Sequence, residues 1–131
     1  MNLVYGICSI CGNRMEVNAI SCIHCNEGVN KMDKLKENIV EWSKNRGLNS
    51  AEPSKQFIKL MEEIGELAQG MAKANKLQII DSIGDVFVVL VILAEQHGLD
   101  IEHCVEYAWE EIKDRKGKMV DGVFVKEEDL K

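Results

Sequence analysis

The sequence predicts an all-α protein, a four-helix bundle preceded by a small metal-binding module, and three observations support this prediction. Aromatic residues make up only 5% of the 131 residues and Pro53 is the only proline, which favours helices over a β-sandwich. From about Met32 onward, apolar residues recur three and four positions apart. Four of the five cysteines lie before that point. We therefore expect two units, residues 1–30 and 31–131.

The charge balance and the absence of targeting features narrow the class of function. The net charge of −6 argues against a general nucleic-acid binder, because such proteins cluster Lys and Arg. The longest apolar run, Val86–Ala94, is too short to span a bilayer, and the N-terminus has no signal-peptide pattern. We expect a cytoplasmic protein with no membrane and no nucleic-acid partner. The charge does not exclude a small phosphorylated substrate, because acidic side chains can hold Mg²⁺, which then neutralises the phosphates.

The periodicity and the helix-ending residues define four helical segments in the second unit. Gly47 and Gly98 follow two of them, Pro53 suits a first helical turn, and Asp100 is a plausible N-cap. The segments run over about residues 33–45, 53–74, 77–97 and 100–114. Their short connections favour antiparallel neighbours in a compact bundle, and residues 122–125 read as a brief extended segment.

Two cysteine pairs in the first unit have the spacing of a zinc ribbon. Cys8 and Cys11 are separated by two residues, as are Cys22 and Cys25. With this spacing, each pair can sit on a single turn that supplies two thiolates to one metal ion. About thirty residues cannot bury a core of their own, so a metal would supply the folding energy. We predict structural Zn²⁺ on these four cysteines, with redox CxxC sites or an incidental cluster as alternatives. The fifth, Cys104, is expected to be a small buried apolar residue.

Carboxylates gather on two of the predicted helices. Glu62, Glu63 and Glu66 are three and four positions apart and share one side of the second helix. Asp81 and Asp85 are four apart on the third helix, just before its apolar run, where an ionised Asp is costly unless paired or metal-bound. Facing helices with such pairs can hold one or more Mg²⁺. A solvated acidic face and helix-dipole stabilisation are the alternative readings.

A basic segment follows the fourth helix. Four cations stand in six residues: Lys113, Arg115, Lys116 and Lys118. They are either a basic C-terminal cap on the helix dipole or a set of phosphate clamps, and the spacing favours neither.

The acidic motifs resemble those of the MazG-like all-α NTP pyrophosphohydrolases, whose pattern is EExxE followed by ExxD. Here Glu62-Glu63-x-x-Glu66 precedes a second motif ending in Gly84-Asp85, and the tail segments Glu111–Met119 and Gly122–Val125 add support. The resemblance covers about residues 33–126 and is strongest to short, phage-type members. It implies hydrolysis of a (d)NTP between the α and β phosphates, giving the monophosphate and pyrophosphate.

The resemblance also implies roles for individual residues. Glu63, Glu66 and Asp85 would be ligands of Mg²⁺ (or Mn²⁺), and Glu62 would be a further ligand or orient the attacking water. The phosphates would be reached by Lys113, Arg115 and Lys116. Family members form dimers or tetramers, so a homo-oligomer is expected.

One position departs from the family pattern. The first acid of ExxD is Ser82 here, a weaker and neutral ligand, and Asp81 is the neighbour that would replace it. This leaves the number of metal ions open.

The substrate is expected to be a (d)NTP, and the phage-like pattern favours purine deoxynucleotides such as dGTP or dATP. Trp42, Gln56 and Lys59 are candidates for a base pocket between the first two helices, although each could equally be core or surface. The main rival is a catalytically inactive adaptor in which the ribbon and the helices bind a protein partner, with Ser82 as its support. A ribbon-containing transcription factor is disfavoured by the net charge of −1 over residues 1–30.

Overall fold

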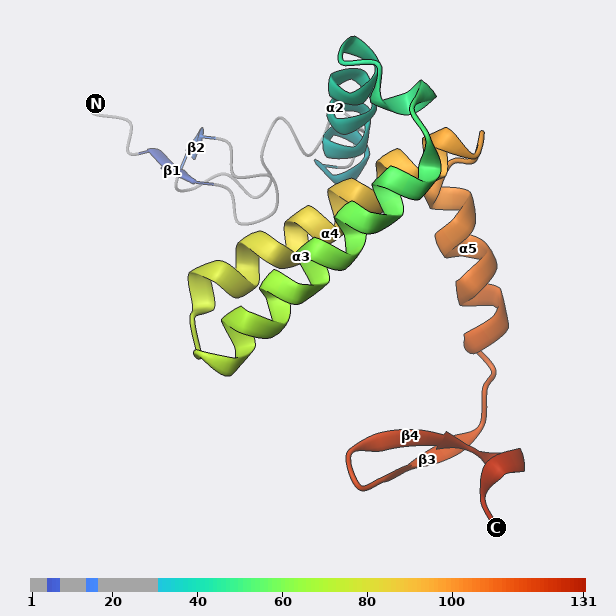
Figure 1. Ribbon diagram of the computed structural model, residues 1–131. Coiled ribbons are helices and arrows are strands. Elements are labelled where there is room, and N and C mark those ends of the chain that lie inside the picture. The colour runs from blue at the N-terminus through green and yellow to red at the C-terminus, as the bar shows by residue number, and fades with distance from the viewer. Residues whose placement is uncertain (1–4, 8–13, 17–30) are drawn as a thin grey trace.

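The computed structural model describes residues 5–7, 14–16 and 31–131 (Figure 1). This part of the chain is mostly helical. The helices are α2 (Lys31–Asn45), α3 (Pro53–Ala72), α4 (Lys76–Gln96) and α5 (Ile101–Ile112), with two 3₁₀ turns, η1 (Leu48–Ser50) and η2 (Glu127–Asp129). The predicted helical class and the four helices are confirmed, and each end lies within two residues of its expected position.

Helices α3 and α4 form an antiparallel hairpin that is the main packing unit of the chain (Figure 1). The Asn75 side chain caps α4 by accepting a hydrogen bond from the Gln78 backbone N–H at 3.3 Å. A Cβ added at Gly70 would lie 3.1 Å from the Gln78 side chain, so glycine permits the two helices to approach closely. The hairpin therefore fixes which residues of α3 face α4.

The outer helices pack mainly on α4. Helix α2 contacts α4 and η1, and α5 contacts α4 near the start of α5. Lys36 of α2 pairs with Asp100 at 3.4 Å and with Glu102, which ties α2 to the N-terminus of α5. Asp100 also caps α5 by accepting from the Glu102 N–H at 2.8 Å, and this contact holds the pKa of Asp100 below its usual value.

The four helices do not close into the compact bundle that the short connections predicted. Helix α5 diverges from α3 and α4 after its first turns (Figure 1). The buried apolar residues of the described chain are few: Leu60, Val89, Val91, Ile92 and Ala94. Large apolar side chains of every helix stay exposed, including Phe57, Leu77, Ile83 and Trp109. The described residues therefore leave much of the apolar surface of these helices uncovered.

The tail forms a hairpin where the sequence predicted only an extended segment. Strand β3 (Gly117–Val120) pairs antiparallel with β4 (Val123–Lys126), with Gly117 opposite Lys126. The two-residue turn has positive φ at both Asp121 (48°) and Gly122 (81°), as a type I′ turn requires. The hairpin lies beyond the end of α5, apart from α3 and α4 (Figure 1).

Helix α4 is long and apolar enough to cross a membrane by length and composition alone, with a mean hydropathy of 2.2 over its best window. The apolar run of nine residues noted in the sequence is thus only part of a longer apolar helix. Core helices of soluble proteins pass the same test. We interpret α4 as a core helix because it packs along α3 and carries Asp81 and Asp85.

The N-terminal unit is described only in two short strands. Strand β1 (Tyr5–Ile7) pairs antiparallel with β2 (Arg14–Glu16), with Gly6 opposite Met15. The predicted zinc ligands Cys8, Cys11, Cys22 and Cys25 lie outside the described residues.

Candidate functional site

The carboxylate of Glu63 is the centre of the candidate site. Helix α3 places this side chain against α4, where it is only 7% exposed. Its Oε1 accepts from Lys59 Nζ at 2.7 Å, while its Oε2 is buried without a hydrogen-bond partner among the described residues. A buried carboxylate oxygen without a partner is costly, so Glu63 has an open coordination position suited to a cation.

Lys59 is the counter-ion of this cluster. Besides Glu63, its ammonium group contacts Glu62 Oε2 at 3.2 Å. Hydrogen bonds to Glu63 and then Glu62 raise the pKa of Lys59 to about 12. Lys59 is half exposed, so its head group reaches the cluster from the solvent side.

Asp85 brings a second carboxylate from α4. It is half buried, and burial, followed by the charges of Glu63 and Asp81, raises its pKa, whereas the charge of Lys59 acts in the opposite direction. The acidic motifs of α3 and α4 are therefore close enough to interact, as the sequence predicted. A divalent cation would relieve the repulsion between these groups.

The other motif positions divide between solvent and core. Glu62, Glu66 and Asp81 are exposed, whereas Ser82 is only 2% exposed and lies among the buried residues of α4. Ser82 thus occupies a packing position, and Asp81 is the acidic neighbour with access to the cluster. Within residues 31–131 and the two short strands, no three His, Cys, Asp or Glu side chains are already gathered for a metal ion.

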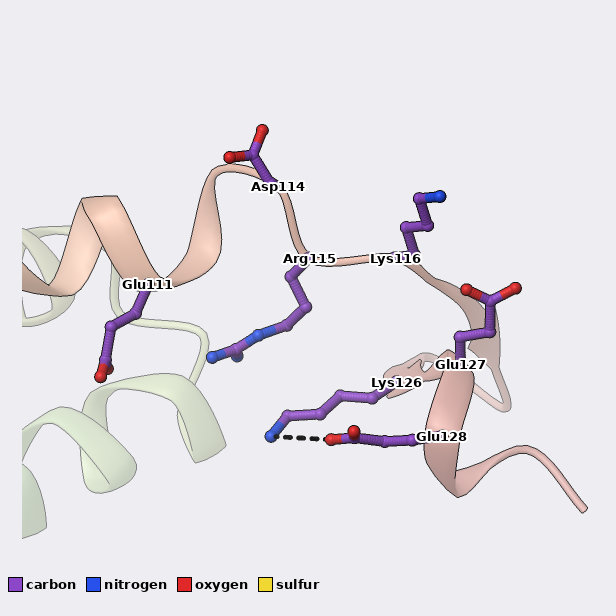
Figure 2. A pocket seen from close by; sticks show the side chains of 7 residues that line it. All are labelled: Glu111, Asp114, Arg115, Lys116, Lys126, Glu127 and Glu128. Carbon is purple, nitrogen blue, oxygen red and sulfur yellow. Dashed lines mark ion pairs between the residues drawn. The ribbon is translucent and has the colours of Figure 1, made fainter.

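Two residues of the basic segment, Arg115 and Lys116, line a separate pocket of about 640 Å³ between the end of α5 and the hairpin (Figure 2). Arg115 and Lys126 extend toward the same space, whereas Lys116 points away from it (Figure 2). Acidic residues share the lining: Glu111, Asp114, Glu127 and Glu128. Lys126 pairs with Glu128 at 3.8 Å, and Lys113 pairs with Glu110. The pocket is therefore mixed in charge.

The basic segment does not meet the acidic cluster within one chain. Helix α5 carries Lys113, Arg115 and Lys116 away from the middle of α3 and α4, where Glu63 and Asp85 lie (Figure 1). A site that uses both sets of residues needs a rearrangement or a second copy of the chain.

The predicted base-pocket residues are not brought together either. Helix α2 packs on α4 rather than along α3, so the expected space between the first two helices is not an extended interface. The Arg46 guanidinium stacks over the Trp42 ring at 4.2 Å, Gln56 is buried in α3, and Lys59 faces the acidic cluster.

Sequence reasoning missed two features of these sites. The role of Lys59 as counter-ion was visible in its spacing of three and four positions from Glu62 and Glu63. Lys126 joins Arg115 only because the hairpin folds back, which the Asp121-Gly122 dipeptide signals.

Comparisons with known proteins agree with the motif-based assignment. The family model described as "MazG-like family" matches residues 44–122. An "Uncharacterized 18.2 kDa protein in rep-hol intergenic region" of Haemophilus phage HP1 (strain HP1c1) is 53% identical over 70 residues. The match covers 53% of this chain and 43% of that relative, so this chain spans less than half the relative's length. No solved structure matches the chain.

Proposed function

Because the chain belongs to the MazG-like family, we propose that it is a nucleotide pyrophosphohydrolase that converts a (d)NTP to the (d)NMP and pyrophosphate. The observation that carries the proposal is the buried Glu63 carboxylate, with one open oxygen and the Asp85 carboxylate within electrostatic range on the facing helix. Carboxylates that are clustered and partly desolvated repel one another when too few positive charges lie nearby. A divalent cation stabilises such a cluster.

The donor set fits Mg²⁺ or Mn²⁺, since every candidate ligand is a carboxylate oxygen. Glu63 and Asp85 would hold the ion, Glu66 and Asp81 would complete its ligands from the exposed side, and Glu62 would add a ligand or orient the attacking water. When bound, the ion would neutralise the phosphates and make a water more acidic. Val89, which is buried one turn after Asp85 on α4, would help to keep bulk water from this side of the site.

We propose that a second copy of the chain supplies the basic segment. The segment that follows α5 lies apart from α3 and α4 (Figure 1), and the exposed apolar residues of α3, α4 and α5 call for a covering partner. In a homo-oligomer, Lys113, Arg115 and Lys116 would reach a triphosphate held at the acidic cluster of a neighbour.

Mixing two inactive variants tests this arrangement. Glu63→Gln and Arg115→Ala/Lys116→Ala are each expected to lose turnover by 10² or more. A refolded mixture of the two variants should recover about a quarter of wild-type activity. Half of randomly formed dimers contain one copy of each variant, and one of the two composite sites in such a dimer is intact. No recovery from stable mixed oligomers would place both sets of residues in the same chain.

We also propose a structural Zn²⁺ on Cys8, Cys11, Cys22 and Cys25. The support is the spacing of the two cysteine pairs, and β1 and β2 pair on either side of residues 8–13. Metal analysis should find one zinc per chain, and Cys8→Ser should lower that content. Zinc-free protein after refolding in Zn²⁺ would contradict the proposal.

We propose that the substrate is a purine deoxynucleotide such as dGTP or dATP. The enzyme would act in nucleotide sanitation or supply in the cytoplasm of a phage-infected host. The phage relative supports this setting. Incubation with each NTP and dNTP plus Mg²⁺, followed by chromatography of the products, tests it. Monophosphate and pyrophosphate without diphosphate are expected. No product from any nucleotide would reject the enzymatic proposal.

The second candidate is an inactive adaptor that binds a protein partner. Two observations favour it: Ser82 is buried where the family has an acid, and large apolar side chains are exposed on each helix. It predicts a folded protein without turnover and without Mg²⁺ affinity beyond that of an ordinary acidic surface.

A further inference from the structure

Lys59 reaches the oxygens that the proposed metal ion would also use. Its Nζ lies 2.7 Å from Glu63 Oε1 and 3.2 Å from Glu62 Oε2. Its charge is also felt by Asp85 on α4. One ammonium group thus partly neutralises three carboxylates of the cluster.

The position of Lys59 is not the one that best stabilises a helix. An i,i+4 ion pair contributes more when the Glu precedes the Lys, whereas Lys59 precedes both Glu62 and Glu63. The pair with Glu63 also leaves the second oxygen of this buried carboxylate unsatisfied. The arrangement is therefore better explained by the acidic cluster than by helix stability.

The geometry also leaves Lys59 free to move. Its side chain is 48% exposed and its stem has four rotatable bonds, whereas Glu63 is fixed by burial between the helices. A divalent ion on Glu63 would repel the ammonium group, and the phosphates that accompany the ion would attract it.

We propose, building on the proposed function, that Lys59 is a built-in competitor of the divalent cation, released from Glu63 and Glu62 when the ion binds and then drawn to the phosphates of the nucleotide. Lys59 thereby couples the two binding events: metal binds weakly alone and tightly with nucleotide. It is a positioning residue of the acidic cluster before it becomes a phosphate contact.

The proposal is tested by Mn²⁺ binding to the protein without nucleotide. Electron paramagnetic resonance of the free ion measures this binding. Lys59→Met should bind Mn²⁺ roughly tenfold more tightly than wild type or better, because one neighbouring charge changes the proton affinity of a carboxylate by about one to three pKa units. Lys59→Arg keeps the charge and should stay near wild type. Lys55→Met removes an exposed charge one turn earlier on α3 and should leave the affinity unchanged.

A second readout covers the coupling. A non-hydrolysable nucleotide should raise the Mn²⁺ affinity of wild type strongly and that of Lys59→Met several-fold less. If Lys59→Met folds poorly in EDTA, Lys59→Gln replaces it. The rise in melting temperature on adding Mn²⁺ is then a second measure of affinity, and it should be larger for either variant than for wild type.

The outcomes separate this inference from the proposed function. Equal or weaker Mn²⁺ binding by folded Lys59→Met, beside a wild type that binds Mn²⁺ and hydrolyses nucleotide, overturns only the role of Lys59. Folded wild type and variant that both fail to bind Mn²⁺ overturn the metal site, and the role of Lys59 with it.

Discussion

At the scale of single residues, the candidate site is centred on the buried carboxylate of Glu63, which is paired with Lys59 and lies within electrostatic range of Asp85. The side of α3 that carries Glu62, Glu63 and Lys59 follows from positions three and four apart, so it is readable from the sequence. The burial of Glu63 and the repulsion between Glu63 and Asp85 depend on how α4 is positioned against α3. No local pattern encodes that register.

Asp85→Asn should stabilise the metal-free protein at neutral pH. The raised pKa of Asp85 means that its charged form is disfavoured in the folded state. The folded state therefore loses stability as the pH rises above 3.8, the ordinary pKa of an aspartate, and regains it as the pH falls through the folded pKa. Asparagine removes this cost. Melting in EDTA at pH 7 and at a pH below 3.8 measures it, with the larger gain expected at pH 7.

Mg²⁺ provides the control for that prediction. It should raise the melting temperature of wild type and not that of Asp85→Asn, because the variant lacks a ligand. If Asp85→Asn is less stable than wild type in EDTA at pH 7, the charge of Asp85 does not destabilise the metal-free protein.

At the scale of elements, the helices were predictable and the hairpin was overlooked. Apolar spacing and the capping residues located all four helices because each has one apolar face. The β3–β4 hairpin is signalled by Asp121-Gly122, but four-residue strands with exposed side chains show little periodicity. The open placement of α5 has no local signal, since it depends on what covers its apolar residues.

Gly70→Val should destabilise the α3–α4 hairpin by about 1–3 kcal/mol. A Cβ at this position lies 3.1 Å from the Gln78 side chain and 3.3 Å from the Ile79 side chain, so a branched residue must push α4 away. Chemical unfolding measures the loss. Met71→Val puts the same side chain on the exposed neighbouring position and should cost less than 1 kcal/mol. A loss at Gly70 no larger than the loss at Met71 would contradict the close approach of α3 and α4, because helix propensity alone favours valine over glycine.

Gly117→Ala should open the β3–β4 hairpin. The added Cβ would lie 2.3 Å from the Val125 backbone oxygen and 2.5 Å from the Phe124 ring, and the backbone contact cannot be relieved by a rotamer change. Amide hydrogen exchange in β4 should accelerate, while Met119→Ala, at an exposed position of the same strand, should leave it unchanged. Unchanged protection in Gly117→Ala would contradict the register.

At the scale of the whole molecule, the described residues of one chain leave large apolar surfaces exposed. Only 28% of the apolar window of α4 is buried, and large apolar residues are exposed on each of the four helices. The basic segment lies apart from the acidic cluster (Figure 1). Both observations have one explanation if copies of the chain assemble through these faces.

Sedimentation equilibrium should therefore give a mass of at least twice the 14.8 kDa of one chain at micromolar concentration. Phe57→Glu and Ile83→Glu place a charge on exposed apolar positions of α3 and α4 and should shift the equilibrium toward the monomer. A monomer at all concentrations, with nucleotide turnover intact, would exclude the composite site.

The most direct test of the central claim compares wild type with Glu63→Gln in one nucleotide-hydrolysis assay with Mg²⁺. Glu37→Gln, an exposed position on α2, serves as the matched control. Wild type and control should release monophosphate and pyrophosphate, and the rate of Glu63→Gln should be at least about 10²-fold lower while its helicity is kept, because the substitution removes the charge of the central ligand. Near wild-type turnover in folded Glu63→Gln would contradict the assignment of the site to the acidic cluster of α3 and α4.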